Sequence, residues 1–133
     1  MKDLVTEAAL SAVVITDAGF APDTGPAPLD LAPDVDLAAL APNLSGIPAI
    51  RIPFASFADG RGFTLARRLR LMGYAGHLRA AGHVLADQYA MARRSGFDAV
   101  EISADLATRQ PEGQWLARAN WRAHDHRTRL MAA

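Results

Sequence analysis

The sequence contains no cysteine, and this absence excludes more chemistry than any other feature of the composition. Without cysteine there can be no disulfide bond, no thiolate nucleophile, no cysteine-ligated iron–sulfur cluster and no cysteine-based zinc site. Redox or metal chemistry would therefore need other ligands or a borrowed cofactor. The sequence indicates no cofactor and no metal site, and it leaves the identity of any cofactor unknown.

Long apolar runs are also missing, since no segment approaches the ~20 residues that a membrane helix needs. The N-terminus, Met1-Lys2-Asp3, does not lead into a basic region followed by an apolar stretch, so we expect no signal peptide. Hydrophobic residues make up 50% of the chain and charged residues 21%, which is typical of a folded globular protein. We expect a cytoplasmic protein that has no membrane partner.

The chain is 133 residues long, which favours one domain because domains usually hold about 100–200 residues. A complete eight-stranded α/β barrel needs roughly 200 residues or more, so that fold is excluded. We expect a single α/β domain over residues 1–133. Within it, residues 21–33 are expected to form a proline-rich loop and residues 110–133 a C-terminal helix or tail.

Lysine is nearly absent, and the positive charge is carried almost entirely by arginine. The net charge is 0, but residues 1–60 sum to −6 and residues 61–94 to +6. Arginine forks bind carboxylates and oxyanions through paired hydrogen bonds, so the middle segment is a candidate for holding an anion or an acidic partner. The alternative is that the oppositely charged segments pair within the fold. Few aromatic residues lie among the arginines, so we expect no nucleic-acid partner.

Strand and helix patterns alternate along the chain. Short apolar runs predict strands at residues 11–16, 47–54, 77–81 and 98–102. Helical spacing and capping signals predict helices at residues 34–40, 63–72, 84–94 and 112–126. This order predicts a mostly parallel sheet of about four strands with right-handed crossovers, as an open layered sheet or half of a barrel.

Three of the expected strands should be adjacent and parallel in the core of the sheet, namely Ile50–Phe54, Leu78–Ala81 and Ala99–Ile102. A small sheet leaves two open edges and a face that needs cover. We therefore expect a homo-oligomer, and a dimer in the first instance.

The turn Asp59-Gly60-Arg61-Gly62 follows one of these strands and opens a helix. Ligands of parallel α/β proteins bind at the carboxyl ends of the strands, where glycine lets an anion approach free backbone N–H groups. The guanidinium group of Arg61 would donate further hydrogen bonds to the anion. The turn is therefore a candidate site for an oxyanion or a partner carboxylate. The alternative is that Asp59 caps the helix and Arg61 pairs internally.

Further candidate residues follow the other strands. Arg79 needs a partner if it is buried, and Glu101 on the neighbouring strand is the expected one. His83 is a candidate acid–base group, although a lone histidine is more often a surface or packing residue. Asp87 and Gln88, neighbours on the following helix, either bind a partner or fix a loop to that helix. The residues alone assign no catalytic role.

Three motifs occur together in the middle of the chain. They are Ile52-Pro-Phe-Ala-Ser-Phe-Ala-Asp-Gly-Arg-Gly-Phe-Thr-Leu-Ala-Arg-Arg-Leu-Arg70, Gly76-His-Leu-Arg-Ala-Ala-Gly-His-Val-Leu-Ala-Asp-Gln88 and Arg94-Ser-Gly-Phe-Asp-Ala-Val-Glu101. With these motifs, over about residues 47–102, the chain resembles a bacterial family of unknown function that is typically encoded beside assimilatory sulfite reductase. Its members are often described as oxidoreductases of sulfite reduction. The resemblance implies a pathway rather than a reaction.

Two positions depart from the pattern of that family. His83 stands where an acidic residue is usual, and Ser95 stands where a cysteine is common. A serine cannot do the redox chemistry of a thiol, so we expect no redox role at residue 95.

Two functions from different classes follow. The first is an accessory or partner-binding protein of assimilatory sulfite reduction, without a redox centre of its own and with sulfite reductase subunits as its partner. The second is a small enzyme, an oxidoreductase by resemblance only, that acts on an anionic substrate. The second function requires Asp59, Arg61, Arg79 and Glu101 to meet in one pocket.

Overall fold

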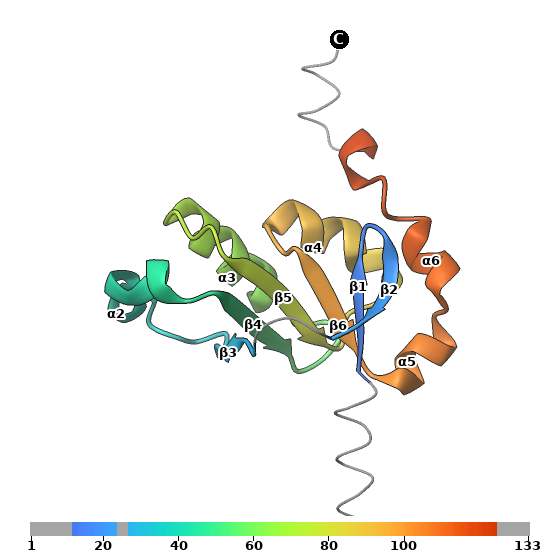
Figure 1. Ribbon diagram of the computed structural model, residues 1–133, viewed down its shortest axis with the longest axis horizontal. Helices are drawn as coiled ribbons and strands as arrows, with labels where there is room; N and C mark the ends of the chain where they lie inside the picture. The colour runs from blue at the N-terminus through green and yellow to red at the C-terminus, as the bar shows by residue number, and fades with distance from the viewer. Residues whose placement is uncertain (1–11, 24–26, 125–133) are drawn as a thin grey trace, which may run out of the picture.

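The computed structural model describes residues 12–23 and 27–124 (Figure 1). Its strands are β1 (Val13–Thr16), β2 (Gly19–Pro22), β3 (Leu29–Asp30), β4 (Ala49–Phe54), β5 (His77–Gly82) and β6 (Ala99–Ile102). Its α-helices are α2 (Leu37–Leu40), α3 (Arg61–Leu71), α4 (Tyr89–Ser95), α5 (Ala104–Arg109) and α6 (Glu112–Leu116). Three 3₁₀ helices are η1 (Ala41–Gly46), η2 (Ala86–Gln88) and η3 (Trp121–His124).

In the described residues the strands form one six-stranded sheet in the order β2-β1-β6-β5-β4-β3. Strands β3, β4, β5 and β6 are parallel, which confirms the prediction that the three core strands are adjacent and parallel. The sheet is open, because β2 and β3 lie at its two edges. The sheet is mixed but mostly parallel, as expected, whereas the expected number of about four strands was too low.

The first strand is antiparallel to its neighbours, and the alternating β–α pattern did not predict this. β1 pairs antiparallel with both β2 and β6. Only Asp17 and Ala18 separate β1 from β2, and so short a connection can join only antiparallel strands. Gly19 opens β2 with a φ of 107°, a left-handed conformation that glycine adopts without strain.

The proline-rich segment 21–33 is not only a loop. The end of β2 and the whole of β3 fall within it, and residues 24–26 lie outside the described part. Both strands are at sheet edges, where a proline is tolerated because its missing N–H faces away from the ladder. The prolines led us to predict a loop where the chain adds two edge strands.

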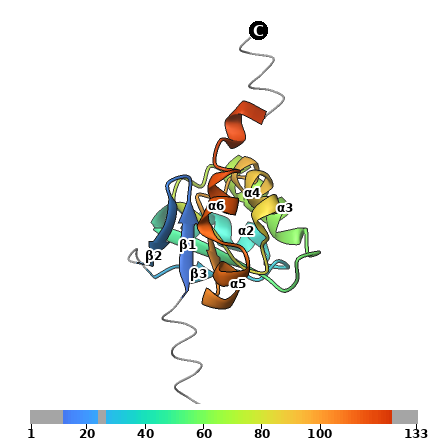
Figure 2. The ribbon, with the colours of Figure 1, turned by 90° about the vertical axis from the view of Figure 1, so that its right-hand side faces the viewer.

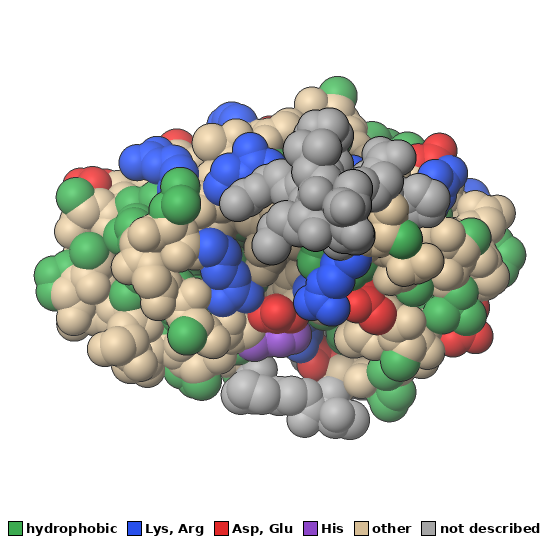
Figure 3. Space-filling view, turned by 90° about the horizontal axis from the view of Figure 1, so that it is seen from above, with side chains coloured by type: hydrophobic (Ala, Val, Ile, Leu, Met, Phe, Trp, Pro, Cys, Tyr) green, Lys and Arg blue, Asp and Glu red, His purple; other side chains and the backbone are tan. Residues whose placement is uncertain are grey.

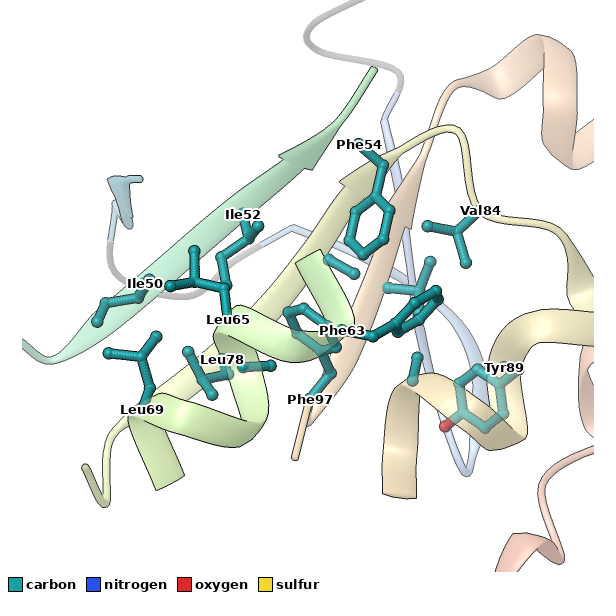
Figure 4. Close-up of a cluster of buried hydrophobic side chains, with 14 of the residues drawn as sticks. Ile50, Ile52, Phe54, Phe63, Leu65, Leu69, Leu78, Val84, Tyr89 and Phe97 are labelled. Atoms are coloured by element: carbon teal, nitrogen blue, oxygen red, sulfur yellow. The ribbon is translucent and has the colours of Figure 1, made fainter. Parts of the chain in front are cut away.

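Helices α3 and α4 cover one face of the sheet (Figure 2). The core lies between these helices and the sheet, and it contains alternate residues of the strands and the inward-facing residues of each helix (Figure 4). On α3 they include Phe63, Ala66 and Leu69, as their helical spacing predicts, and Leu65 joins them. α3 ends in a Schellman motif, in which Tyr74 N–H bonds Leu69 C=O at 3.1 Å and Gly73 has a φ of 94°.

Several predicted helices differ in length from those observed. The segment 84–94 divides into η2 and α4, and Asp36 caps an α2 that begins only at Leu37. Pro42 lies in the first turn of η1, a position that needs no N–H, so it begins a new helix there.

The C-terminal helix predicted over 112–126 was too long. α6 ends at Leu116, and η3 is a separate turn that ends at His124. Residues 125 and 126 lie outside the described part. The short α5, which Ser103 caps by accepting from Leu106 N–H, was not predicted. No helix in the described ranges is both long enough and apolar enough to cross a membrane.

Candidate functional site: a charged hollow at the carboxyl ends of the strands

The face of the sheet opposite α3 and α4 carries the charged residues of the parallel strands. Successive side chains of a strand point to opposite faces, so Ile50 and Ile52 enter the core while Arg51 points away from it. Arg79 and Glu101 share this outer face for the same reason. At the carboxyl ends of β4, β5 and β6 the face forms a hollow of about 620 Å³. Its polar lining residues are Asp23, Asp30, Arg51, His83, Glu101 and Ser103.

Glu101 joins two arginines across the sheet. Its Oε1 accepts from Arg79 Nη1 at 2.8 Å, which confirms the pairing expected from the sequence. Its Oε2 lies 3.2 Å from Arg51 Nη1, a partner that the sequence analysis did not foresee. The carboxylate thus bridges two cations that come from different strands.

Arg79 is 4% exposed, so its charge needs compensation within the protein. Besides Glu101, its Nη1 contacts Asp23 Oδ2 at 3.0 Å. Asp23 directly follows the edge strand β2, whereas Arg79 lies on β5 in the middle of the sheet. The Asp23 side chain therefore lies over the outer face, and its carboxylate completes the pairing of Arg79.

The guanidinium group of Arg51 pairs with the carboxylate of Asp30. Nε lies 2.6 Å from Asp30 Oδ1 and Nη2 lies 3.0 Å from Oδ2, a bidentate arrangement. The hydrogen bonds from Arg51 hold the pKa of Asp30 below its usual value, and those to Asp30 hold the pKa of Arg51 above its own. The Asp30 side chain is 57% exposed and that of Arg51 only 28%, so the carboxylate is the outer member of the pair.

His83 is the group in the hollow best suited to proton transfer. Its Nδ1 lies 3.0 Å from the carbonyl oxygen of Phe54. Because a carbonyl only accepts hydrogen bonds, Nδ1 must carry the proton, and in the neutral ring Nε2 is then free to accept one. The hydroxyl oxygen of Ser103 already accepts from Leu106 N–H at 3.1 Å in its capping role.

The turn at Asp59 lies apart from this hollow. Arg61 Nε donates to Asp59 Oδ1 at 3.0 Å, and the backbone N–H of Arg61 bonds the same oxygen at 3.2 Å. The structure thus has the internal pair that we set out as the alternative to an anion site. Gly62 packs against Phe54 so closely that a Cβ there would overlap the ring, whereas Gly60 has open space around it.

Asp87 and Gln88 make contacts that hold neighbouring segments. Asp87 pairs with Arg118 at 2.7 Å on the surface. Gln88 accepts from Leu85 N–H at 2.8 Å and donates to the carbonyl oxygen of Phe57 at 2.9 Å. Gln88 therefore fixes the loop after β4 to η2, the structural role that we gave as one of its two alternatives.

Of the candidate residues, His83 and Glu101 line the hollow, and Arg79 pairs with Glu101 without lining it. Asp59 and Arg61 do not join them in this hollow, so the four residues of the enzyme hypothesis are not in one pocket. Sequence reasoning missed Asp23, Asp30 and Arg51. The alternation of Arg51 between Ile50 and Ile52 was a usable signal for the outer face.

The amino ends of the strands carry a second charged cluster, seen from above in Figure 3 around a histidine. Asp98 Oδ2 accepts from Arg70 Nη2 at 2.8 Å and lies 3.9 Å from His77 Nδ1. Burial, and then the nearby charge of Arg79, lower the pKa of His77 below its usual value. Burial thus favours the neutral form of His77, although Asp98 favours the charged form.

No group of three or more histidine, aspartate or glutamate side chains among the described residues is placed to hold a metal ion. The hollow contributes arginine forks, carboxylates and one imidazole. Such groups recognise charged partners through paired hydrogen bonds.

The fold and the hollow together define a small open-sheet α/β protein with a charged site at the carboxyl ends of its parallel strands. The chain belongs to the family described as "Bacterial protein of unknown function (DUF934)", whose model matches residues 28–121, well over half of its length. No curated protein matches it. No solved structure matches it either.

Proposed function

We propose that this chain is an accessory, partner-binding protein of assimilatory sulfite reduction, with no redox centre of its own and with sulfite reductase as its partner. The pathway comes from the resemblance to a family encoded beside that enzyme. The mode of action comes from the hollow, whose charged side chains are held in ion pairs with one another. Such an arrangement supports the recognition of a charged group.

The observation that carries the proposal is the exposed, bidentate pair between Arg51 and Asp30. Asp30 lies on a two-residue edge strand, and its carboxylate is the outer and more exposed member of the pair. A partner carboxylate that replaced it would receive the same two donors, Nε and Nη2, without a change in the buried contacts of Glu101 and Arg79. Charge-assisted hydrogen bonds of this kind contribute roughly 1.5–3 kcal/mol each.

Calorimetric titration of the full chain into purified sulfite reductase from the same bacterium tests this proposal. We expect saturable binding, and Arg51→Met should weaken it by about tenfold or more. The matched control is Arg109→Met, which removes an exposed arginine that pairs with Asp105 on helix α5 and does not line the hollow. The absence of saturable binding, or equal affinities for the two variants, would contradict the proposal.

A small enzyme acting on an anionic substrate is the second candidate, with Arg51 and His83 in place of the four residues first expected to meet, and His83 favours it. The ring lies in the same hollow as Arg51, with Nε2 free to accept a proton while the arginine holds the anion. If this function is correct, His83→Gln abolishes turnover and leaves the affinity for sulfite reductase unchanged. A partner-binding protein shows no turnover in either form.

A further inference from the structure

A second hollow, of about 660 Å³, opens at the amino ends of β4 and β5, away from the charged site. Leu44, Ile47 and Pro48 line one side of it, and Met72 and Tyr74 line the other. The phenol of Tyr74 donates to the carbonyl oxygen of Ile47 at 2.8 Å, so its polar group is already bonded within the protein. The remaining lining is mostly apolar, with Ser45 as a polar side chain.

Large apolar side chains continue from this groove onto the surface. The Schellman motif turns Tyr74 inward and leaves Leu71, the last residue of α3, 82% exposed. Met72, at the groove wall, is also exposed. A single exposed leucine is ordinary, but two large apolar residues beside an apolar groove form a continuous patch.

Arginines border this patch on α3. Arg67 and Arg68 lie four residues before Leu71 and Met72, so each cation shares a helix face with one apolar residue. Helix α3 contains no acidic residue. Among the residues described, no carboxylate lies within ion-pair distance of Arg67 or Arg68, whereas four of the seven arginines between residues 61 and 94 pair with a carboxylate.

We propose that this surface, the groove together with Leu71, Met72, Arg67 and Arg68, binds a segment of a protein partner that carries acidic side chains next to large apolar ones. Charge complementarity selects this occupant: two arginines that pair with no carboxylate of the described residues would attract acidic side chains, and the groove would take the apolar ones. A basic or wholly apolar segment would leave the arginines unpaired. The proposal does not depend on the charged hollow or on Arg51.

Fluorescence polarisation with a labelled synthetic helical peptide that combines glutamate and leucine tests this inference. The comparison peptide carries lysine in place of every glutamate. We expect the acidic peptide to bind and the basic one not to bind. Binding should weaken as salt rises from roughly 50 mM to 500 mM, because salt screens exposed charges.

Two variants locate the site. Arg68→Glu and Leu71→Ser should each raise the dissociation constant by about tenfold or more. Arg109→Glu is the control, since it makes the same charge reversal on α5, outside this surface. Thermal melts of all three variants check that they remain folded. We expect them to fold, because the side chains of Arg68 and Leu71 are exposed.

Failure of the acidic peptide to bind, equal binding of the two peptides, or equal effects of Arg68→Glu and Arg109→Glu would overturn the inference. A second copy of the chain is the competing occupant. Sedimentation of the unliganded protein tests it: an oligomer that Leu71→Ser converts to a monomer would assign the surface to self-association and overturn the proposed partner. Arg51→Met should leave peptide binding unchanged, so this test and that of the proposed function fail separately.

Discussion

Arg51 on β4 and Arg79 on β5 lie directly opposite each other in the register of these two parallel strands, so both point to the same outer face of the sheet. Like charges directly opposite each other are destabilising. Glu101 resolves this conflict from the next strand, because its carboxylate lies 2.8 Å from one guanidinium and 3.2 Å from the other. Glu101 is thus the carboxylate that the two arginines share, whereas Asp23 and Asp30 each pair with one of them.

Removal of that carboxylate should be costly. We expect Glu101→Ala to lower the free energy of unfolding by about 3 kcal/mol, because it leaves two neighbouring arginines, one of them buried, without their shared partner. Urea denaturation measures this change. Asp105→Ala is the control, since it breaks an exposed pair with Arg109 and should cost at most about 1 kcal/mol. Similar losses for the two variants would contradict this role of Glu101.

Of the two glycines at the start of α3, only one should be sensitive to substitution by alanine. Gly62→Ala places a methyl group into the ring of Phe54 and should destabilise the protein by roughly 1–3 kcal/mol. Gly60 has open space and a φ of −86°, so Gly60→Ala should change stability by less than about 0.5 kcal/mol. Thermal melts compare them. A tolerated Gly62→Ala would show that Phe54 does not pack there as described.

His77 should make stability depend on pH in mildly acidic solution. Its pKa is lowered in the folded protein, so below its ordinary value of 6.5 the unfolded chain binds more protons than the folded one. Stability should therefore fall as the pH drops below about 6.5. His77→Gln should reduce this slope, as measured by urea denaturation between about pH 7 and pH 5. Parallel pH profiles for the two proteins would show that the folded state does not perturb His77.

The turn before α3 remains a predicted anion site, and Asp59 now enters its test as an internal competitor. Sulfate must displace Asp59 from Arg61, so it should raise the melting temperature of Asp59→Ala more than that of the wild type. Arg61→Ala should show no sulfate effect and should keep its fold. If sulfate shifts wild type and Arg61→Ala equally, or shifts none of the proteins, the turn is only a helix cap.

The parallel centre of the sheet was predictable because its strands are apolar runs separated by segments with helical spacing. The pairing of Arg79 with Glu101 was predictable for the same reason, since neighbouring strands bring long side chains within reach. Asp23 and Asp30 were not predictable. They lie in a proline-rich segment whose edge pairing depends on the assembled sheet, and no local pattern places Asp23 over β5.

The central claim is that Arg51 binds a carboxylate of the partner, and the affinities of two variants for sulfite reductase test it most directly. If a carboxylate of sulfite reductase takes the place of Asp30 at the fork of Arg51, the two carboxylates compete. Titration calorimetry should then show tighter binding for Asp30→Asn and weaker binding for Arg51→Met, each relative to wild type. Weaker binding for both variants, or no change in either, would contradict the account.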